Sequence, residues 1–369
     1  MLFTSGKIGS LTVPNRLVRS ATAERMADGD GRPRPALERM YRDLARGGVG
    51  LIITGHTYVH PSGKAHSEMT GIYSDALVPG LAALADAVHD EGGLIAVQIN
   101  HGGMQCSREA VAETMAPSAV AASFLERPAR EMTPDEIAAM IQAFAQAARR
   151  VKEAGFDGVQ IHGAHGYLIS QFLSPFANQR TDEWGGDLAG RMRFLEAVCR
   201  AVRAAVGADY PVFIKLGMMD GVEGGLTPEE GAQVVAALAG MGLDGVEISG
   251  GIGGDRNLNA RLGVRSEADE AFLRPLAHRA RPVTRLPIAL VGGFRSRRVM
   301  ADVLDAGDAD FISMCRPLIC EPDLPNRLRL GQQERSACIS ANRCWPEKPG
   351  EGIACKCPIG REDSMRKAQ

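Results

Sequence analysis

The sequence predicts an α/β protein built as a single (β/α)8 barrel, the TIM barrel. Eight short apolar runs, rich in β-branched residues, alternate along the chain with longer segments of helical period. Runs that are hydrophobic almost throughout are typical of parallel strands buried on both faces. The alternative fold is a doubly wound open sheet. The sequence disfavours it because no glycine-rich dinucleotide fingerprint follows the first run.

The predicted strands and helices follow one another in regular order. The strands cover residues 16–21, 48–55, 94–100, 156–162, 212–217, 243–250, 287–293 and 309–315. The clearest helix covers 134–155, with Thr133 suited to the N-cap, Pro134 at the first position and Gly155 at the end. Similar helices are predicted at about 189–206, 228–241, 270–280 and 296–306.

The chain is longer than a minimal barrel of this kind. It has 369 residues, whereas about 250 are typical. The segment KIGSLTVPN near the N-terminus predicts a short hairpin, and long loops are expected at 101–133, 163–188 and 251–269. We expect residues 1–330 to form the barrel and residues 331–369 to form a cysteine-rich tail packed on it.

The charge, hydropathy and cysteine content of the chain exclude several classes of binding partner. The net charge is −2, so the chain lacks the excess of basic residues that is typical of nucleic-acid-binding proteins. No run approaches the roughly 20 apolar residues that span a membrane, and the N-terminus has no signal-peptide core. Four of the eight cysteines lie between 338 and 357, unlike a secreted disulfide framework. These features predict a cytoplasmic protein without nucleic-acid or membrane partners.

Polar residues gather where the predicted strands end. Catalytic groups on this barrel lie at the C-terminal ends of the strands. The stretch IHGAHGY puts His162, His165 and Tyr167 at the end of the fourth strand. The same rule nominates Ala21, Thr22, Ala23, Gly55, His56, Gln98, Asn100, His101, Lys215, Ser249, Gly250, Gly292, Gly293, Cys315 and Arg316.

Two groups of these positions indicate charged ligands. Gly292 and Gly293 with Arg316, at the ends of strands seven and eight, are typical of a phosphate site. Lys215 stands in an otherwise apolar strand and needs a partner. That partner is either a carboxylate of another strand, such as Glu247, or a ligand anion, and the residues leave both readings open.

A zinc hydrolase is an alternative from another class of enzyme. His162 and His165 have the spacing of half a zinc site, and His56, His60 and His101 are further candidate ligands. A catalytic zinc usually has three protein ligands and an open position. No His-x-His or His-Glu-x-x-His is present, so this remains the minority reading.

Residues 161–195, IHGAHGYLISQFLSPFANQRTDEWGGDLAGRMRFL, closely resemble the central motif of the old yellow enzyme family, the FMN-dependent ene-reductases. VPNRLVRSAT, GVGLIITG, AVQINHGG and FISMCRPLICEPDLPN are similar to other family motifs, in the same order, and the resemblance covers roughly residues 1–330. It implies an FMN-dependent NAD(P)H oxidoreductase that reduces the activated C=C bond of α,β-unsaturated carbonyl compounds. NADH or NADPH would be the reductant. The alternative on the same fold is oxidation or demethylation of an N-methylated amine.

The resemblance also implies a role for each site residue. Gln98 would bind the flavin pyrimidine edge, and Lys215 would lie by N1 and the C2 carbonyl. His162 and His165 would donate hydrogen bonds to the substrate carbonyl, and Tyr167 would deliver a proton. The other cofactor-binding positions would be Ala21, Thr22, Ala23, Gly55, Gly292, Gly293, Cys315 and Arg316, the last four about the phosphate.

The chain departs from the family pattern at two places. Ala23 stands where relatives carry Thr or Cys near the flavin C4 carbonyl. The tail is similar to the cluster-binding segment of the dienoyl-CoA reductase and trimethylamine dehydrogenase type, but Ala341 replaces one cysteine. We therefore expect free thiols or a lost site, rather than an intact iron–sulfur cluster, at Cys338, Cys344, Cys355 and Cys357, and leave zinc or a degenerate cluster open as alternatives. The physiological alkene and a homo-oligomeric state are left open.

Overall fold

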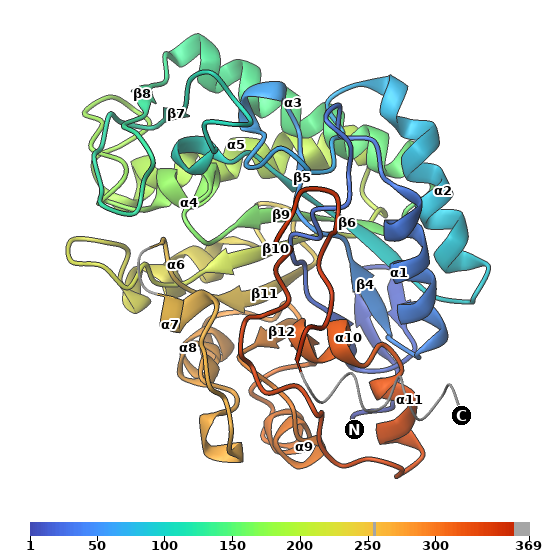
Figure 1. Cartoon of the computed structure of the whole chain (residues 1–369). Helices are drawn as coiled ribbons and strands as arrows, with labels where there is room; N and C mark the ends of the chain where they lie inside the picture. Colours follow the sequence, from blue (N-terminus) through green and yellow to red (C-terminus); the bar gives the residue numbers. More distant parts are fainter. Residues whose placement is uncertain (254–255, 358–369) are drawn as a thin grey trace.

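Eight parallel strands close into the predicted barrel, with the helices outside it (Figure 1). The computed structural model describes residues 1–253 and 256–357. Each barrel strand pairs with the next barrel strand along the chain, and β13 pairs with β3 to close the ring. The barrel strands are β3 (Leu17–Arg19), β4 (Leu51–Ile53), β6 (Ile95–Asn100), β9 (Gly158–Gly163), β10 (Val212–Gly217), β11 (Gly245–Ser249), β12 (Ile288–Val291) and β13 (Phe311–Met314). Each predicted run therefore matches a barrel strand. Most of these strands are shorter than the run, and β9 extends one residue past it, to Gly163.

The helices also follow the predicted pattern. The longer ones are α1 (Pro35–Arg46), α2 (Val78–His89), α3 (Pro134–Glu153), α5 (Leu188–Val206), α6 (Pro228–Ala237), α8 (Arg274–Ala280) and α9 (Arg297–Asp305). α3 begins as expected: the Thr133 hydroxyl accepts from the Glu136 N–H, and the Glu136 carboxylate accepts from the Thr133 N–H. The helices predicted at 189–206, 228–241, 270–280 and 296–306 are α5, α6, α8 and α9.

Several short elements were not predicted from the sequence. They are α4 (Leu168–Leu173), α7 (Arg256–Asn259), α10 (Arg316–Cys320), α11 (Leu324–Arg329), β5 (Thr57–Tyr58), β7 (Met115–Ala116) and β8 (Arg130–Glu131), with 3₁₀ turns at Pro61–Gly63, Asp75–Leu77, Gly103–Gln105, Glu267–Asp269 and Arg281–Val283. The expectation of a loop over 163–188 was wrong at α4. All six residues of this helix are buried, so packing stabilises a helix too short to be recognised by its period.

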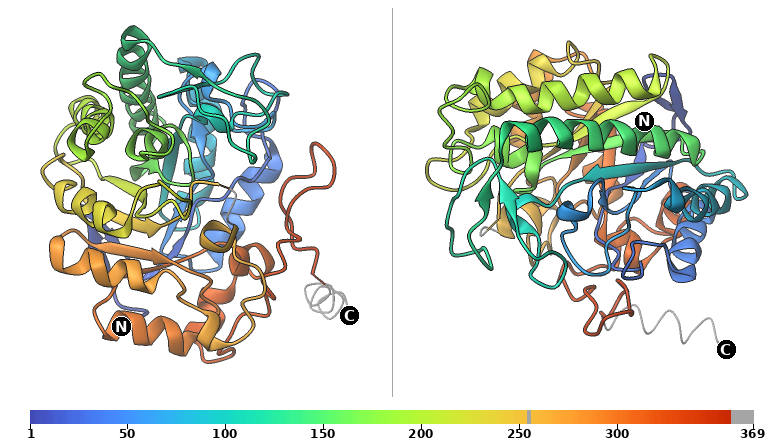
Figure 2. Two further views of the ribbon diagram at one scale, coloured as in Figure 1. Left: turned by 90° about the vertical axis from the view of Figure 1, so that its left-hand side faces the viewer. Right: turned by 90° about the horizontal axis from the view of Figure 1, so that it is seen from above.

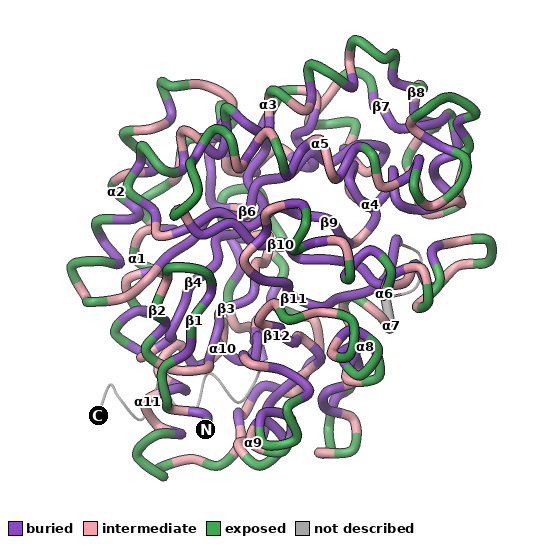
Figure 3. Tube along the Cα trace, turned by 180° about the vertical axis from the view of Figure 1, so that it is seen from behind, coloured by how far each residue is buried: buried purple, intermediate pink, exposed green. Residues whose placement is uncertain are grey.

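The N-terminal hairpin closes one end of the barrel. Its strands β1 (Gly6–Ile8) and β2 (Leu11–Val13) pair antiparallel, as predicted. Ile8 and Val13 pack against Leu51, Phe213 and Phe311 inside the ring. The barrel strands are buried along their length, whereas exposed residues gather on the outer faces of helices and in loops (Figure 3). A site inside the barrel must therefore open at the other end, where the strands terminate.

The tail crosses the front of the barrel in Figure 1, and in both views of Figure 2 it lies on the side of the molecule away from the end marked N. The Ile353 N–H donates to the Glu24 carbonyl at 2.8 Å, and the Gly350 N–H donates to the Glu68 carboxylate. Residues 358–369 of the predicted tail lie outside the described residues. None of the helices within the described ranges is long and apolar enough to cross a membrane.

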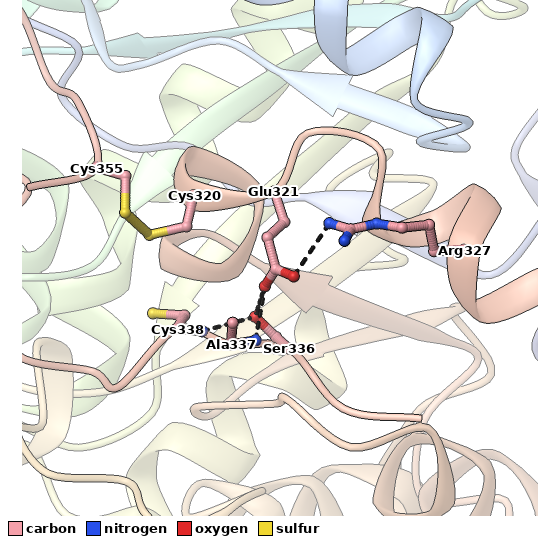
Figure 4. The surroundings of a disulfide bond; sticks show 7 residues. All are labelled: Cys320, Glu321, Arg327, Ser336, Ala337, Cys338 and Cys355. Atoms are coloured by element: carbon pink, nitrogen blue, oxygen red, sulfur yellow. Dashed lines mark hydrogen bonds and ion pairs between the residues drawn. A yellow bond between two sulfur atoms is a disulfide. The ribbon is translucent and has the colours of Figure 1, made fainter. Parts of the chain in front are cut away.

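A disulfide joins α10 to the tail (Figure 4). Cys320 is bonded to Cys355, so the expectation of a free Cys355 was wrong. The neighbouring Glu321 carboxylate accepts from the Ser336 hydroxyl, and from the Ala337 N–H at 2.8 Å, which fixes the root of the tail. The sequence separation of 35 residues between the two cysteines gave no sign of this pairing.

The remaining tail cysteines are buried thiols. Cys338, Cys344 and Cys357 carry no disulfide, and burial raises the pKa of the Cys344 thiol to about 12. Across residues 1–253 and 256–357, no three His, Cys, Asp or Glu side chains lie so as to hold a metal ion.

Candidate functional site

A cavity of about 620 Å³ opens at the C-terminal ends of the barrel strands. Its size suits a small-molecule ligand or cofactor. The wall includes most of the predicted site residues: Ala21, Thr22, Ala23, His56, Gln98, His162, His165, Tyr167, Lys215, Ser249, Gly293, Cys315 and Arg316. Residues from all eight strand ends therefore meet at one place, as the barrel rule requires.

Two predicted cofactor positions lie off the cavity wall. The Gly55 N–H donates to Glu24 Oε1 at 2.7 Å, and a Cβ at Gly55 would fall 1.8 Å from Glu24 Oε2. Gly292 packs against the backbone of Ala271 and Leu273. Both glycines are needed for close packing behind the wall, and their contacts with a cofactor stay predictions. Asn100, His101 and Gly250 also stay outside the lining.

Lys215 enters the cavity from β10 and is held from below. Its Nζ donates to the Ser20 hydroxyl at 2.6 Å and lies 3.4 Å from Glu247 Oε1. Lys215 and Glu247 stand opposite each other on neighbouring strands, and both are buried. The carboxylate partner is therefore real, and the lysine also faces the cavity. The two readings of this residue are compatible.

A chain of polar side chains extends this pair across the barrel. The Gln98 amide donates to Gln160 Oε1 at 2.7 Å, and the Gln160 amide donates to Glu247 Oε2 at 2.9 Å. Ser20 donates to the other oxygen of Glu247. These hydrogen bonds fix Gln98 and Lys215 in the cavity floor. Gln160 and Ser20 were not predicted, although Gln160 stands two residues before His162 on the same face of its strand.

His162 and His165 present ring edges to the cavity as neutral imidazoles. The Ala164 N–H donates to His162 Nδ1 at 3.3 Å, so the ring proton must lie on Nε2. His165 Nε2 lies 2.7 Å from the Ser249 hydroxyl. Burial lowers the pKa of His162 far below its usual range and lowers that of His165 to about 3, helped by the Lys215 charge. The site can thus offer neutral N–H donors.

Tyr167 lies directly beside these histidines. Its ring centroid is 4.9 Å from that of His162 and 5.0 Å from that of His56. Burial raises the pKa of the phenol to about 12, so it keeps its proton at neutral pH. His56 was nominated as a strand-end residue, and the structure brings it to the same wall. A retained phenolic proton next to two donors suits general-acid chemistry.

The end of the cavity opposite Tyr167 and the histidines is suited to an anion. Gly293 has a left-handed φ of +76°, and the buried Ser313 hydroxyl on this wall has no partner among the described residues. Arg316 Nη1 donates to the Arg261 carbonyl at 2.8 Å and to Asn342 Oδ1 at 2.6 Å. These contacts, and a longer one of 3.4 Å to the Ser340 carbonyl, all use Nη1 and leave the Nε and Nη2 donors for a ligand. With the Lys215 cation in the floor, the cavity fits the FMN that the sequence implies.

Part of the wall comes from residues that were not predicted to line the site. The loop after β3 contributes Arg25, the segment after β6 contributes Gln105, and the tail contributes Asn342 and Trp345. The Gln105 amide donates to the carbonyls of His165 and Ile252, which ties two loops together. Sequence patterns gave no signal for these residues because they reach the site only through long-range contacts.

The alternatives find little support in this wall. His101 is bonded to Ser62 and Gly103, and His60 is exposed, so the described residues supply no zinc-ligand set. A cationic amine would require an aromatic or acidic cage. The described lining has aromatic side chains, among them Tyr167, Phe272, Phe294 and Trp345, but it contains no Asp or Glu and includes the cations Arg25, Lys215 and Arg316.

Comparisons with known proteins agree with the fold and with the predicted family. Residues 1–335 match the model of the NADH:flavin oxidoreductase / NADH oxidase family. An NADH oxidase of Thermoanaerobacter brockii is 37% identical over 98% of this chain and 56% of its own length. An NADPH dehydrogenase of Geobacillus sp. (strain WCH70) is 36% identical over 88% of this chain and 92% of its own length.

A solved structure is similar along the whole chain. The old yellow enzyme homologue of Zymomonas mobilis superposes with a TM-score of 0.80 at 28% identity, over 98% of both chains. By contrast, the chain spans only 56% and 51% of the first two curated relatives that it matches. The barrel, its cavity and the family match together show that the chain belongs to the NADH:flavin oxidoreductase / NADH oxidase family, the old yellow enzyme family.

Proposed function

We propose that this chain is an FMN-dependent oxidoreductase that uses NADH or NADPH to reduce the activated C=C bond of α,β-unsaturated carbonyl compounds. The observation that carries the proposal is the pair of neutral donors beside a protonated phenol. His162 must hold its proton on Nε2, and Tyr167 keeps its own at neutral pH. The match to an NADPH dehydrogenase over 92% of its length supports the same reaction class.

The cofactor would lie in the cavity between the Lys215 floor and the Gly293 end. The chemistry that FMN supplies when bound is hydride transfer, taken from the nicotinamide and given to the alkene. Lys215 and Gln98 would hold the electron-rich edge of the ring system, and Gly293, Cys315 and Arg316 would hold the phosphate. Ala21, Thr22 and Ala23 would supply main-chain contacts at the adjoining wall.

The substrate carbonyl would accept hydrogen bonds from His162 and His165. Negative charge develops on this oxygen as the alkene is reduced, and preoriented donors stabilise it. Tyr167 would then protonate the α-carbon as general acid. These roles need neutral histidines, which the burial of both rings provides.

A spectroscopic experiment tests the proposal. The purified protein should be yellow, lose its colour anaerobically with NADPH or NADH, and recover it with cyclohex-2-enone while the saturated ketone accumulates. A colourless protein whose activity is abolished by a chelator would instead favour the zinc hydrolase. The cytoplasmic location, the homo-oligomer and the absence of nucleic-acid and membrane partners stay predictions from the sequence.

A further inference from the structure

Arg25 stands in an unusual backbone conformation at the mouth of the cavity. Its φ is +54°, in the left-handed region that non-glycine residues rarely adopt. The preceding residue is fixed: the Glu24 carboxylate binds Arg19, Tyr41 and the Gly55 N–H, and the Glu24 carbonyl accepts from the Ile353 N–H. With Glu24 held from both sides, the chain turns sharply at Arg25, and the side chain is directed into the cavity wall.

The Arg25 guanidinium has no anionic partner in the described chain. Its Nε is buried without a hydrogen-bond acceptor, and no carboxylate among the described residues forms an ion pair with it. The other cations of the wall differ in this respect, because Lys215 pairs with Glu247 and Arg316 donates to three oxygens. A partly buried guanidinium that lacks an acceptor is suited to a ligand anion.

Trp345 of the tail supports this cation from one side. The Arg25 Cζ lies 5.6 Å from the centroid of the Trp345 ring, in a cation–π contact. Both side chains line the cavity. The contact provides no acceptor oxygen to the guanidinium, so its N–H groups remain available to bind a carboxylate or phosphate in the bidentate manner.

The cation lies on the Tyr167 side of the cavity. Burial chiefly sets the pKa of Tyr167 and of His56, and the charge of Arg25 lowers both. Arg25 is therefore close to the groups that would meet the substrate. Arg316, in contrast, is held beside Cys315 by the Arg261 carbonyl and the tail.

We propose that Arg25 is a specificity-determining residue that binds an anionic group, carboxylate or phosphate, of the molecule that enters the site. This rests on the proposed function. Two sources carry such a group: an acid group on the unsaturated substrate and the diphosphate of NADH or NADPH. An enzyme with this arrangement prefers charged substrates to neutral ones of the same size.

Two matched pairs of compounds distinguish the sources. In the oxidative half-reaction, cyclohex-2-enone is compared with the same ring bearing a carboxylate. In the reductive half-reaction, 1-benzyl-1,4-dihydronicotinamide, which has no phosphate, is compared with NADH. Stopped-flow flavin absorbance gives the dissociation constant of each compound. Arg25→Gln should weaken the charged member of one pair by about 10–100-fold relative to its neutral member.

The variants include their own controls. Arg25→Lys should retain part of the preference, because it keeps the charge but not the planar fork. Arg343→Gln removes an exposed tail charge outside the cavity and should keep the parental ratio. If Arg25→Gln does not fold, Arg25→Asn replaces it, since Asn adopts the left-handed region more readily.

Each outcome decides the proposal. A selective loss for the acid enone or for NADH confirms anion binding and identifies the source. If Arg25→Gln changes the dissociation constants of both members of both pairs equally, anion binding by Arg25 is wrong. The proposed function would still hold in that case, provided that the parent protein reduces cyclohex-2-enone. If the parent reduces no enone, the proposed function fails, and the NADH pair alone decides the role of Arg25.

Discussion

Lys215 Nζ lies 3.4 Å from Glu247 Oε1, across the register of β10 and β11, with both side chains buried. The same carboxylate accepts from Ser20 and Gln160. The lysine therefore has a partner before any ligand enters. Its charge is partly neutralised in the floor of the cavity, and a bound anion would share it with Glu247. Removing either charge should have consequences for both folding and cofactor chemistry.

Lys215→Met should destabilise the protein because it leaves the Glu247 carboxylate buried without a cation. Breaking a buried ion pair in this way costs about 3–5 kcal/mol. The double variant Lys215→Met/Glu247→Gln should recover most of that stability, since no charge is left unpaired. Urea unfolding of the parent, the single variant and the double variant measures both effects. Equal stability of the single and double variants would show that the pair is not coupled.

Flavin reduction by NADPH should respond differently in the same variants. The reduced cofactor carries more negative charge than the oxidised one, so losing the Lys215 cation should slow reduction in both the single and the double variant. Restored stability without a restored rate separates the two roles of the lysine. A parental reduction rate and potential in the folded double variant would mean that Lys215 does not contact the cofactor.

Much of the fold and part of the site follow from local sequence. The eight strands are short, continuous apolar runs, and the Thr133 cap with Glu136 marks the start of α3 before any tertiary contact is known. His162, His165 and Tyr167 follow from one rule about where barrel strands end. Gly55 and Gly292 satisfy that same rule, yet they pack behind the wall.

The rest of the site depends on contacts between distant segments. Arg25 reaches the cavity because Glu24 is fixed by residues of α1, of the β4 loop and of the tail. The Trp345 contact requires the tail to fold back over 320 residues of chain. The Cys320–Cys355 bond likewise joins segments whose cysteine spacing allows several pairings. Periodicity and motifs carry no information about such neighbours.

The Cys320–Cys355 bond predicts the thiol count of the purified protein. Under denaturing conditions without reductant, six thiols should react, and after reduction all eight should. Closing a loop of this size stabilises by about 3–4 kcal/mol in the chain-entropy model. Cys320→Ser and Cys355→Ser should therefore weaken the attachment of the tail equally, and the double variant should be no worse than either. Limited proteolysis of the tail measures this.

The same variants test the link between the tail and the cofactor site. The tail residues Ser340 and Asn342 accept hydrogen bonds from Arg316. A loosened tail should therefore raise the dissociation constant of FMN. Eight reactive thiols in unreduced protein, or an unchanged rate of tail cleavage in both variants, would contradict the role of the disulfide.

Buried neutral histidines predict a loss of stability in mild acid. His66 is buried, neither ring nitrogen has a partner among the described residues, and burial lowers its pKa to about 2. The unfolded chain binds a proton below about pH 6.5 and the folded protein does not, so stability is complete above pH 6.5 and falls as the pH drops. At pH 5 this one residue lowers the free energy of unfolding by about 2 kcal/mol relative to its value above pH 6.5. Urea unfolding at pH 7 and pH 5 measures the free energy of unfolding of both proteins. Between these two pH values, the decrease for His66→Phe should be about 2 kcal/mol smaller than the decrease for the parent. Identical losses in the two proteins would show that His66 is not held neutral by the fold.

The histidine pair and Tyr167 can be separated by following the two half-reactions. In the variant His162→Ala/His165→Ala, FMN should still bind and be reduced by NADPH, but reoxidation by cyclohex-2-enone should slow by about 10²–10³-fold, since the enolate oxygen loses its donors. The two losses need not add, because the donors act as a unit. Reoxidation by oxygen needs no such anchor and should survive.

Tyr167→Phe should give a different pattern in the same stopped-flow experiment. The dissociation constant of the enone should stay near the parental value, because the donors of His162 and His165 remain, whereas turnover should fall by about 10²–10⁴-fold at protonation. With the pKa of His165 near 3 and that of the phenol near 12, neither group should produce a step in the oxidative rate between pH 5 and pH 8. Parental enone reduction in the double alanine variant, or loss of its flavin, would assign these histidines a structural role. A Tyr167→Phe variant with the parental rate would require another proton donor in the cavity wall, and His56, 5.0 Å from the Tyr167 ring, is the residue to replace next.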